Sequence, residues 1–403
     1  MFLLNIFFCV ILFIAGLYLK KIYSGYSKYD HKILNWLYIY HVAIGIVFYF
    51  YVMAYGGDAT VYWDKAMQFS FSDIITMISN GSATGFILLV NYVPAQVLKL
   101  SFFSGSFLYI VLGYWGVLLF YNIIKEILPH YTYISKYKLL FIPIFPGLLF
   151  LPNLHFWTSG LGKDTILFFC VALFMHSIIN MKKRFIGLIA SMAFGFFIRP
   201  HIVLFLMISF GIATLFDVKM KTYQKILIVA VFASLAFYLF SYVMNFVKLE
   251  SLDTQTIEAY SANKTRVLSS SSGSGIDLSS YSYPAKVFTF LYRPLFFDIN
   301  GVLAVVSSFE NLILLIFTIK VIFNNSIPTF RVSNRVIKSL LFFFLIGALT
   351  FSLILGNLGI MLRQKVPFIF ALIVFGYTTF SYELSLKRMA FLKRKRIQEG
   401  LSK

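Results

Sequence analysis

Long apolar runs separated by short polar stretches repeat along this chain, and they constrain its fold more than any other feature. Each run holds roughly 17–25 residues, the length that a helix needs to cross about 30 Å of hydrocarbon. Hydrophobic residues make up 60% of the 403 positions and charged residues 12%, which excludes an ordinary soluble globule. We therefore expect an all-α fold, a polytopic transmembrane helical bundle that forms one integral membrane domain over residues 1–403. The eleven predicted spans are 2–19, 33–55, 104–124, 139–155, 165–181, 185–198, 201–216, 226–247, 301–323, 339–356 and 367–382.

Lysine and arginine set the orientation of these spans, because cytoplasmic loops carry the excess of positive charge. Most of the 35 Lys and Arg fall in one set of loops, so we place the amino terminus outside and the basic tail 383–403 in the cytoplasm. The basic residues cluster at helix ends, which indicates membrane lipid rather than nucleic acid as the partner. Residues 84–100 contain Pro94, Gln96 and Lys99, and a full span there would invert all later loops. We predict that this segment is re-entrant or interfacial.

Two outward stretches are long enough for structure of their own. Apolar spacing in residues 56–83 predicts a short amphipathic helix lying on the membrane. Residues 248–285 are polar and rich in Ser and Gly, which predicts a mobile outward loop, either a lid or a plain tether. Arg266 lies in the middle of this loop and Arg293 follows its far end.

The outward loop after the second span begins with Gly56, Gly57 and Asp58. Two glycines allow a tight turn and a close approach of backbone to a ligand. A carboxylate at this point can act as a general base toward an incoming hydroxyl, although a turn or N-cap residue has the same pattern. Tyr62 and Trp63 follow, as a surface on which a sugar stacks or as anchors at the membrane interface.

Gly160 and Gly162 precede Lys163 and Asp164 at the predicted start of a helix. A glycine-rich turn, a lysine and the free N–H groups of a helix start together favour anion binding. Asp164 either caps the helix or pairs with Lys163 or with an arginine from another loop. The alternative for Lys163 is a lysine whose ammonium reaches the interface from the helix end.

Arg199, Pro200 and His201 occupy a very short outward hairpin, so Arg199 is expected at or below the membrane interface. An uncompensated guanidinium is costly there. A phosphate or diphosphate is a natural partner because the planar guanidinium binds it through two hydrogen bonds. His201 is a candidate for proton transfer. The alternative is that Arg199 pairs with an internal carboxylate such as Glu310.

Arg363 and Lys365 lie in another outward turn, and Arg293 precedes Pro294 at the start of a membrane segment. Together with Lys163 and Arg199, these cations predict a positively charged bowl. No zinc, paired-aspartate or nucleophile-elbow motif occurs in a suitable setting, so we expect no bound metal and no cofactor.

This layout resembles the GT-C superfamily of membrane glycosyltransferases, and within or beside it the bacterial repeat-unit polymerases of O-antigen and exopolysaccharide. The aspartate of the first large outward loop, Asp58, and a series of short outward hairpins carry the resemblance. Gly160–Asp164 is similar to the small-Lys-acid motif of these polymerases, and Arg199 and Arg363 are similar to their outward arginines. One departure is that many GT-C enzymes have two close carboxylates in the first loop, whereas here the nearest acidic neighbour of Asp58 is Asp64.

The resemblance implies glycosyl transfer from a polyisoprenyl-diphosphate-linked saccharide to a saccharide acceptor at the outer face, with polysaccharide polymerisation as the result. It implies a bacterial inner membrane and, as partners, other envelope polysaccharide proteins. A flippase or exporter of lipid-linked saccharide is the alternative, and an acyl- or phosphotransferase acting on surface polysaccharide is a third. The expected catalytic residues are Asp58, Asp164 and His201, and the expected substrate-binding residues are Lys163, Arg199, Arg293, Arg363, Lys365, Tyr62 and Trp63.

Overall fold

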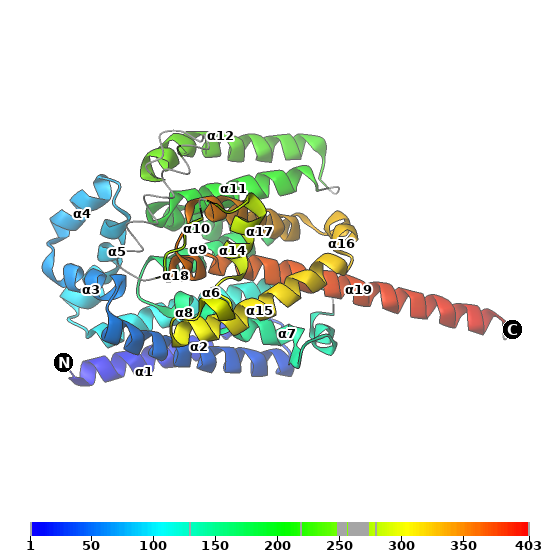
Figure 1. Cartoon of the computed structure of the whole chain (residues 1–403), viewed down its shortest axis with the longest axis horizontal. Helices are drawn as coiled ribbons and strands as arrows, with labels where there is room; N and C mark the ends of the chain where they lie inside the picture. Colours follow the sequence, from blue (N-terminus) through cyan, green and yellow to red (C-terminus); the bar gives the residue numbers. More distant parts are fainter. Residues whose placement is uncertain are drawn as a thin grey trace.

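The computed structural model describes residues 2–128, 130–217, 220–247, 256, 274–278 and 280–401, and it is a bundle of helices (Figure 1). Most of the predicted loop 248–285, including Arg266, lies outside the described residues. The first half of the chain forms α1 (Phe2–Tyr18), α2 (Lys28–Tyr55), α3 (Asp58–Gln68), α4 (Phe71–Ser79), α5 (Ala83–Tyr92), α6 (Phe102–Ile127), β1 (Lys138–Leu139), β2 (Ile142–Pro143), α7 (Ile144–Gly147), α8 (Pro152–Ser159) and α9 (Lys163–Ser177). The second half forms α10 (Phe185–Ile198), α11 (Pro200–Leu215), α12 (Thr222–Val247), α14 (Tyr283–Tyr292), α15 (Val302–Phe323), α16 (Ser326–Val332), α17 (Arg335–Ile354), α18 (Leu358–Gln364) and α19 (Val366–Leu401).

Among the described residues, 8 helical segments are long and apolar enough to cross a membrane. An all-α bundle with membrane-spanning helices is therefore confirmed, and the count of eleven spans stays a prediction. Helices α10 and α11 are apolar but shorter, with 14 and 16 residues. The eight candidate segments are Phe2–Ile22, Lys28–Tyr55, Phe102–Ile127, Lys163–Asn180, Thr222–Phe240, Val302–Phe323, Arg335–Ile354 and Val366–Lys395.

The prediction of one continuous helix over 139–155 is wrong. This segment contains a two-stranded hairpin, in which Leu139 pairs with Ile142, and then the short helices α7 and α8. Pro143, Pro146 and Pro152 explain the break, because proline lacks the N–H that a helix interior needs and its ring clashes with the preceding turn. Hydropathy alone does not register this backbone defect.

The segment 56–83 holds more helix than was predicted, while 84–100 holds no helix long enough to span a membrane. Residues 56–83 hold two helices, α3 and α4, instead of one amphipathic helix. Residues 84–100 contain most of α5, which has 10 residues, followed by a π-helical turn over Val93–Val97. A helix of this length is too short to cross the hydrocarbon. Figure 1 shows α3, α4 and α5 at one end of the bundle, opposite the end from which the C-terminal half of α19 projects.

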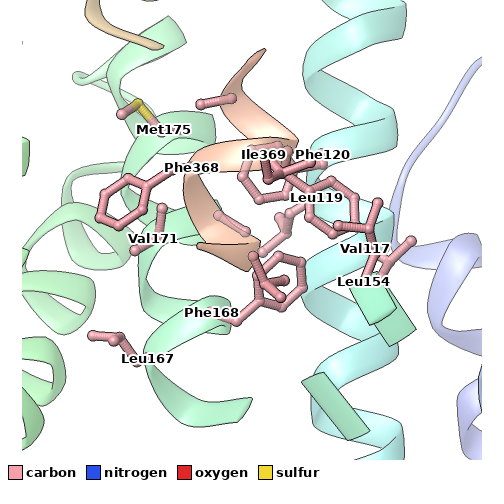
Figure 2. Close-up of a cluster of buried hydrophobic side chains, with 14 of the residues drawn as sticks. Val117, Leu119, Phe120, Leu154, Leu167, Phe168, Val171, Met175, Phe368 and Ile369 are labelled. Atoms are coloured by element: carbon pink, nitrogen blue, oxygen red, sulfur yellow. The ribbon is translucent and has the colours of Figure 1, made fainter. Parts of the chain in front are cut away.

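Close packing between α6, α8, α9 and α19 forms the centre of the bundle (Figure 2). The rings of Phe120, Phe168 and Phe370 lie within 4.9–5.6 Å of one another. Gly113 of α6 faces α8 so closely that a Cβ atom would overlap the carbonyl oxygen of Thr158. In a bilayer, such packing holds helices together, because lipid tails remove most of the hydrophobic driving force.

Loops that were predicted to share the cytoplasmic side contact one another. Arg184 donates two hydrogen bonds to the carboxylate of Glu126, at 3.0 and 2.7 Å. Lys320 Nζ donates to the carbonyl oxygen of Lys138 at 3.1 Å. The bundle therefore has two distinct ends, as the charge pattern requires. Which end faces the cytoplasm stays a prediction.

Candidate functional site: a chain of ion pairs at one end of the bundle

The turn between α2 and α3 places Asp58 at the end of the bundle that holds α3, α4 and α5. Gly56 has a φ of 73° and Gly57 a φ of 141°, which L side chains rarely adopt, and open space surrounds both. The glycines are therefore needed for the backbone path rather than for packing. Asp58 is the first residue of α3, its side chain is 58% exposed, and its Oδ2 accepts a hydrogen bond from Arg363 Nη1 at 3.2 Å.

The start of α9 brings Lys163 and Asp164 to the same place. Gly162 has a φ of 151°, which lets the chain turn sharply into the helix. Lys163 Nζ donates to Thr84 Oγ1 at 3.1 Å and lies 5.4 Å from the centre of the Tyr62 ring. Its ammonium therefore joins α9 to α3 and α5. Asp164, in the first turn of the same helix, points to other partners.

Arg199 connects α10 to α11. Pro200 occupies the first position of α11, where its missing N–H costs nothing. Arg199 Nη2 lies 2.8 Å from Asp164 Oδ1, and Nη1 donates to Gln364 Oε1. Arg199 therefore pairs with an internal carboxylate, as the predicted alternative stated. The carboxylate is Asp164 and not Glu310.

Helix α18 supplies the second arginine. Asn357 caps this helix by accepting a hydrogen bond from the backbone N–H of Ile360 at 3.1 Å. Arg363 Nε donates to Asp164 Oδ2, and Nη1 donates to Asp58. Arg199, Asp164, Arg363 and Asp58 therefore form one alternating series of charges, which we call the ion chain.

Burial varies along the ion chain. The side chains of Arg199 and Asp164 are 14% and 15% exposed, whereas Arg363 is 26% and Asp58 is 58% exposed. A buried charge is costly unless it is paired, and each oxygen of Asp164 pairs with a different arginine. Two carboxylates thus neutralise two arginines, which leaves the charge of Lys163. The predicted strongly positive bowl is replaced by a nearly neutral group that opens to solvent at Asp58.

Tyr62 and Trp63 lie differently from the prediction. Their exposed fractions are 7% and 3%, and the Trp63 ring fills the space beside Gly105 on α6. Burial and, to a smaller extent, the carboxylate of Asp58 raise the pKa of Tyr62 to about 12. Both rings pack between helices, so neither presents an open face to a sugar or to the membrane interface.

His201 and Arg293 have neighbours outside the ion chain. The His201 ring lies 5.9 Å from that of Phe351 and 6.2 Å from that of Phe205. Arg293 pairs with Asp298, with Nε at 3.0 Å from Oδ2. Burial acts to raise the pKa of Asp298, but hydrogen bonds from Arg293 and from a backbone N–H lower it below its usual range.

Lys365 lies inside the bundle and not in an outward-facing turn, with 2% of its surface exposed. Its ammonium donates to the carbonyl oxygen of Leu291 at 2.8 Å and to Asn311 Oδ1 at 2.7 Å. The sequence could not reveal this difference, because Arg363 and Lys365 are two residues apart in a short polar stretch. The helical turn directs their side chains to different surroundings.

A small cavity lies beside the ion chain. Trp157 lines this cavity and was not predicted from the sequence as a site residue. Its indole N–H is buried and has no hydrogen-bond partner among the described residues. A tryptophan within an apolar run gives no signal of such a position. The cavity is lined by Trp157, Thr158, Asp164, Leu167, Phe168, Arg199, Ile202, Arg363, Gln364, Val366 and Pro367.

Comparisons with known proteins add no support to the family resemblance, which depends on the short motifs alone. No known family model matches this chain, and neither a curated protein nor a solved structure matches it. In the part of the chain that the structure describes, no group of three or more His, Cys, Asp or Glu side chains is placed to hold a metal ion. The geometry of the site is therefore what bears on its function.

Proposed function

We propose that this protein transfers a glycosyl group from a polyisoprenyl-diphosphate-linked saccharide to a saccharide acceptor at the extracytoplasmic face of a bacterial cytoplasmic membrane. The ion chain is the observation that carries this proposal. It gathers residues of four separate segments, α3, α9, the α10–α11 turn and α18, at one end of an apolar bundle. Charged residues placed in this way at a membrane boundary usually serve a substrate or an ion.

Asp58 is the proposed general base. Arg363 binds only its Oδ2, and more than half of the side chain is exposed, which leaves Oδ1 accessible to an acceptor hydroxyl. As the hydroxyl oxygen attacks the anomeric carbon, its proton moves to Asp58 and the bond from that carbon to the diphosphate oxygen breaks. The electron pair of that bond remains on the diphosphate.

Arg363 and Lys163 are the proposed partners of the departing diphosphate. Negative charge grows on the diphosphate in the transition state, and cations that are already held in place stabilise it without further rearrangement. Asp164 and Thr84 hold these two cations through the contacts described above. Arg199 then acts one step further from the diphosphate, as the second partner of Asp164.

The proposal also includes the orientation of the bundle in the membrane and the number of times the chain crosses it. The basic segment at the end of α19 lies in the cytoplasm and the ion chain lies outside, as the charge rule implies. Helices α10 and α11 and the broken segment containing α7 and α8 complete eleven crossings. The irregular backbone around α7 is tolerated because its side chains are buried by neighbouring helices.

The test uses purified protein with a polyisoprenyl-diphosphate oligosaccharide and follows longer saccharide products by mass spectrometry. Asp58→Asn should lower the rate about 100-fold or more, since general-base catalysis contributes about 10²–10⁴-fold. Asp64→Asn is the matched control, because Asp64 is an exposed carboxylate on the same helix, and it should leave the rate unchanged. Equal rates for the two variants would refute the role of Asp58.

The same preparation separates the transferase from the flippase. Sealed vesicles containing the wild-type protein and a fluorescent lipid-linked saccharide report movement of the saccharide across the bilayer. Longer products without movement agree with the proposal. Movement of the saccharide without any longer product would refute the transferase and favour the exporter.

A further inference from the structure

Lys365 is a buried cation that the proposed reaction does not use. Its Nζ donates to three oxygens, those of Leu291 at 2.8 Å, Arg293 at 3.5 Å and the Asn311 side chain at 2.7 Å. An ammonium group has three N–H donors, so all of them are occupied. Lys365 therefore links the turn that joins α18 to α19 with the end of α14 and with α15.

Three consecutive residues at this turn have three different sets of partners. Arg363 pairs with Asp164 and Asp58, Gln364 accepts a hydrogen bond from Arg199, and Lys365 reaches into the bundle. Arg363 belongs to the ion chain and Gln364 touches it, while Lys365 is anchored to α14 and α15. The position of Arg363 is thus set by its own ion pairs and by the anchored Lys365 two residues further on.

The anchor of Lys365 is itself held in place. Asn311 Nδ2 donates to the carbonyl oxygen of Pro294 at 2.8 Å, so Asn311 fixes the same stretch of backbone that Lys365 binds. Glu310, next to it in sequence and 3% exposed, attracts Lys365 electrostatically. Glu310 Oε2 also accepts the backbone N–H of Asn153 at 2.7 Å, at the start of α8. The network therefore joins α8, α14 and α15 to the turn after α18.

We infer that Lys365 is a positioning residue for Arg363: it holds α18 against α14 and α15, so that Arg363 meets Asp164 and Asp58 at the mouth of the site. Helix α18 has only 7 residues, and so short a helix has little stability of its own. Its placement depends on contacts with its neighbours. The part of this inference that concerns catalysis rests on the proposed transfer reaction, whereas the part that concerns α18 does not.

The test uses the double variant Lys365→Met/Glu310→Gln in the full-length protein. Removing Lys365 alone leaves the Glu310 carboxylate buried without its counter-charge, which endangers folding. Glutamine at 310 removes that charge and keeps an oxygen that can accept the N–H of Asn153. Lys338→Met is the matched control, because Lys338 is equally buried and donates to the carbonyl oxygen of Phe216 at 2.8 Å.

Hydrogen exchange measured by mass spectrometry reads the position of α18 directly. We expect the backbone amides of 361–365 to exchange at least tenfold faster in the double variant, with exchange in α6 and α9 unchanged. The control should leave exchange in 361–365 as in the wild type. Unchanged exchange across α18 would overturn the inference, and so would faster exchange throughout the bundle, because Lys365 would then be a general structural residue.

Kinetics with the lipid-linked donor provide the second readout. If Lys365 positions Arg363, kcat should fall at least tenfold in the double variant while KM for the donor changes less than threefold, because the charge of Arg363 remains present but is misplaced. A rise of at least tenfold in KM with kcat unchanged would contradict a positioning role for Lys365. A wild-type protein that transfers no sugar would refute the proposed function, and the exchange experiment would still decide whether Lys365 holds α18.

Discussion

Asp164 holds two arginines, and its charge is the one whose removal should destabilise the ion chain most. Asp164→Asn keeps the shape of the side chain but removes its negative charge. Arg199 and Arg363, which are 14% and 26% exposed, would then share only the neutral amide oxygen and the partially exposed Asp58. Breaking a buried ion pair by removing one partner costs about 3–5 kcal/mol, because the other charge stays buried without compensation. We expect the free energy of unfolding to fall by about that amount.

Asp58 provides an internal comparison for this prediction. Asp58→Asn is the same chemical change and removes a partner of the same arginine, but the side chain is 58% exposed. Solvent screens an exposed pair, and such pairs contribute about 0.2–1 kcal/mol. The structure therefore predicts that the loss for Asp164→Asn is several times the loss for Asp58→Asn.

Both variants can be measured by denaturant titration of purified protein in detergent micelles, with helix content followed by circular dichroism. Gel filtration before each titration checks that the starting material is monodisperse. A loss below about 1 kcal/mol for Asp164→Asn, or equal losses for the two variants, would refute the reasoning, because exposed and buried carboxylates would then stabilise the bundle alike.

Two further predictions concern stability. Because the Arg293 ion pair lowers the pKa of Asp298, its stabilisation is present above the unfolded pKa of about 3.9 and is lost as pH falls through the lower folded pKa. Thermal unfolding from pH 7 to pH 3 should therefore show the wild type losing its advantage over Asp298→Asn. Gly113→Ala should destabilise the bundle by about 1–3 kcal/mol, since its Cβ would overlap the Thr158 carbonyl oxygen and force α6 from α8. Gly211→Ala, where nothing lies within 4 Å, should be neutral or stabilising in the same thermal assay, and a reversed order would contradict the packing.

Apolar run length predicted the helical bundle, because the bilayer imposes one length on every crossing. The distribution of Lys and Arg assigned several loops to one side, and two contacts join loops of that set: Arg184 contacts Glu126, and Lys320 contacts Lys138. These rules depend on composition along the chain and need no knowledge of how the helices pack.

The details that failed depend on backbone geometry or on packing. Run length counted 139–155 as a span, although its prolines interrupt the helix. The choice of Asp164 over Glu310 as the partner of Arg199 depends on which helix ends meet. That arrangement is fixed by contacts such as Phe168 against Phe370, which no periodicity in the sequence reports.

The near-neutrality of the ion chain has a consequence for any anion that arrives there. Arg363 binds its two carboxylates through Nε and Nη1, and the remaining N–H groups of its guanidinium can donate to a phosphate oxygen. Asp58 is the more exposed of the two carboxylates, so an anion that competes for Nη1 would weaken the contact with Asp58 before the contact with Asp164. In the proposed reaction, a diphosphate that draws Arg363 toward itself would loosen its hold on Asp58, and the entry of the donor would then make the base more available to the acceptor hydroxyl.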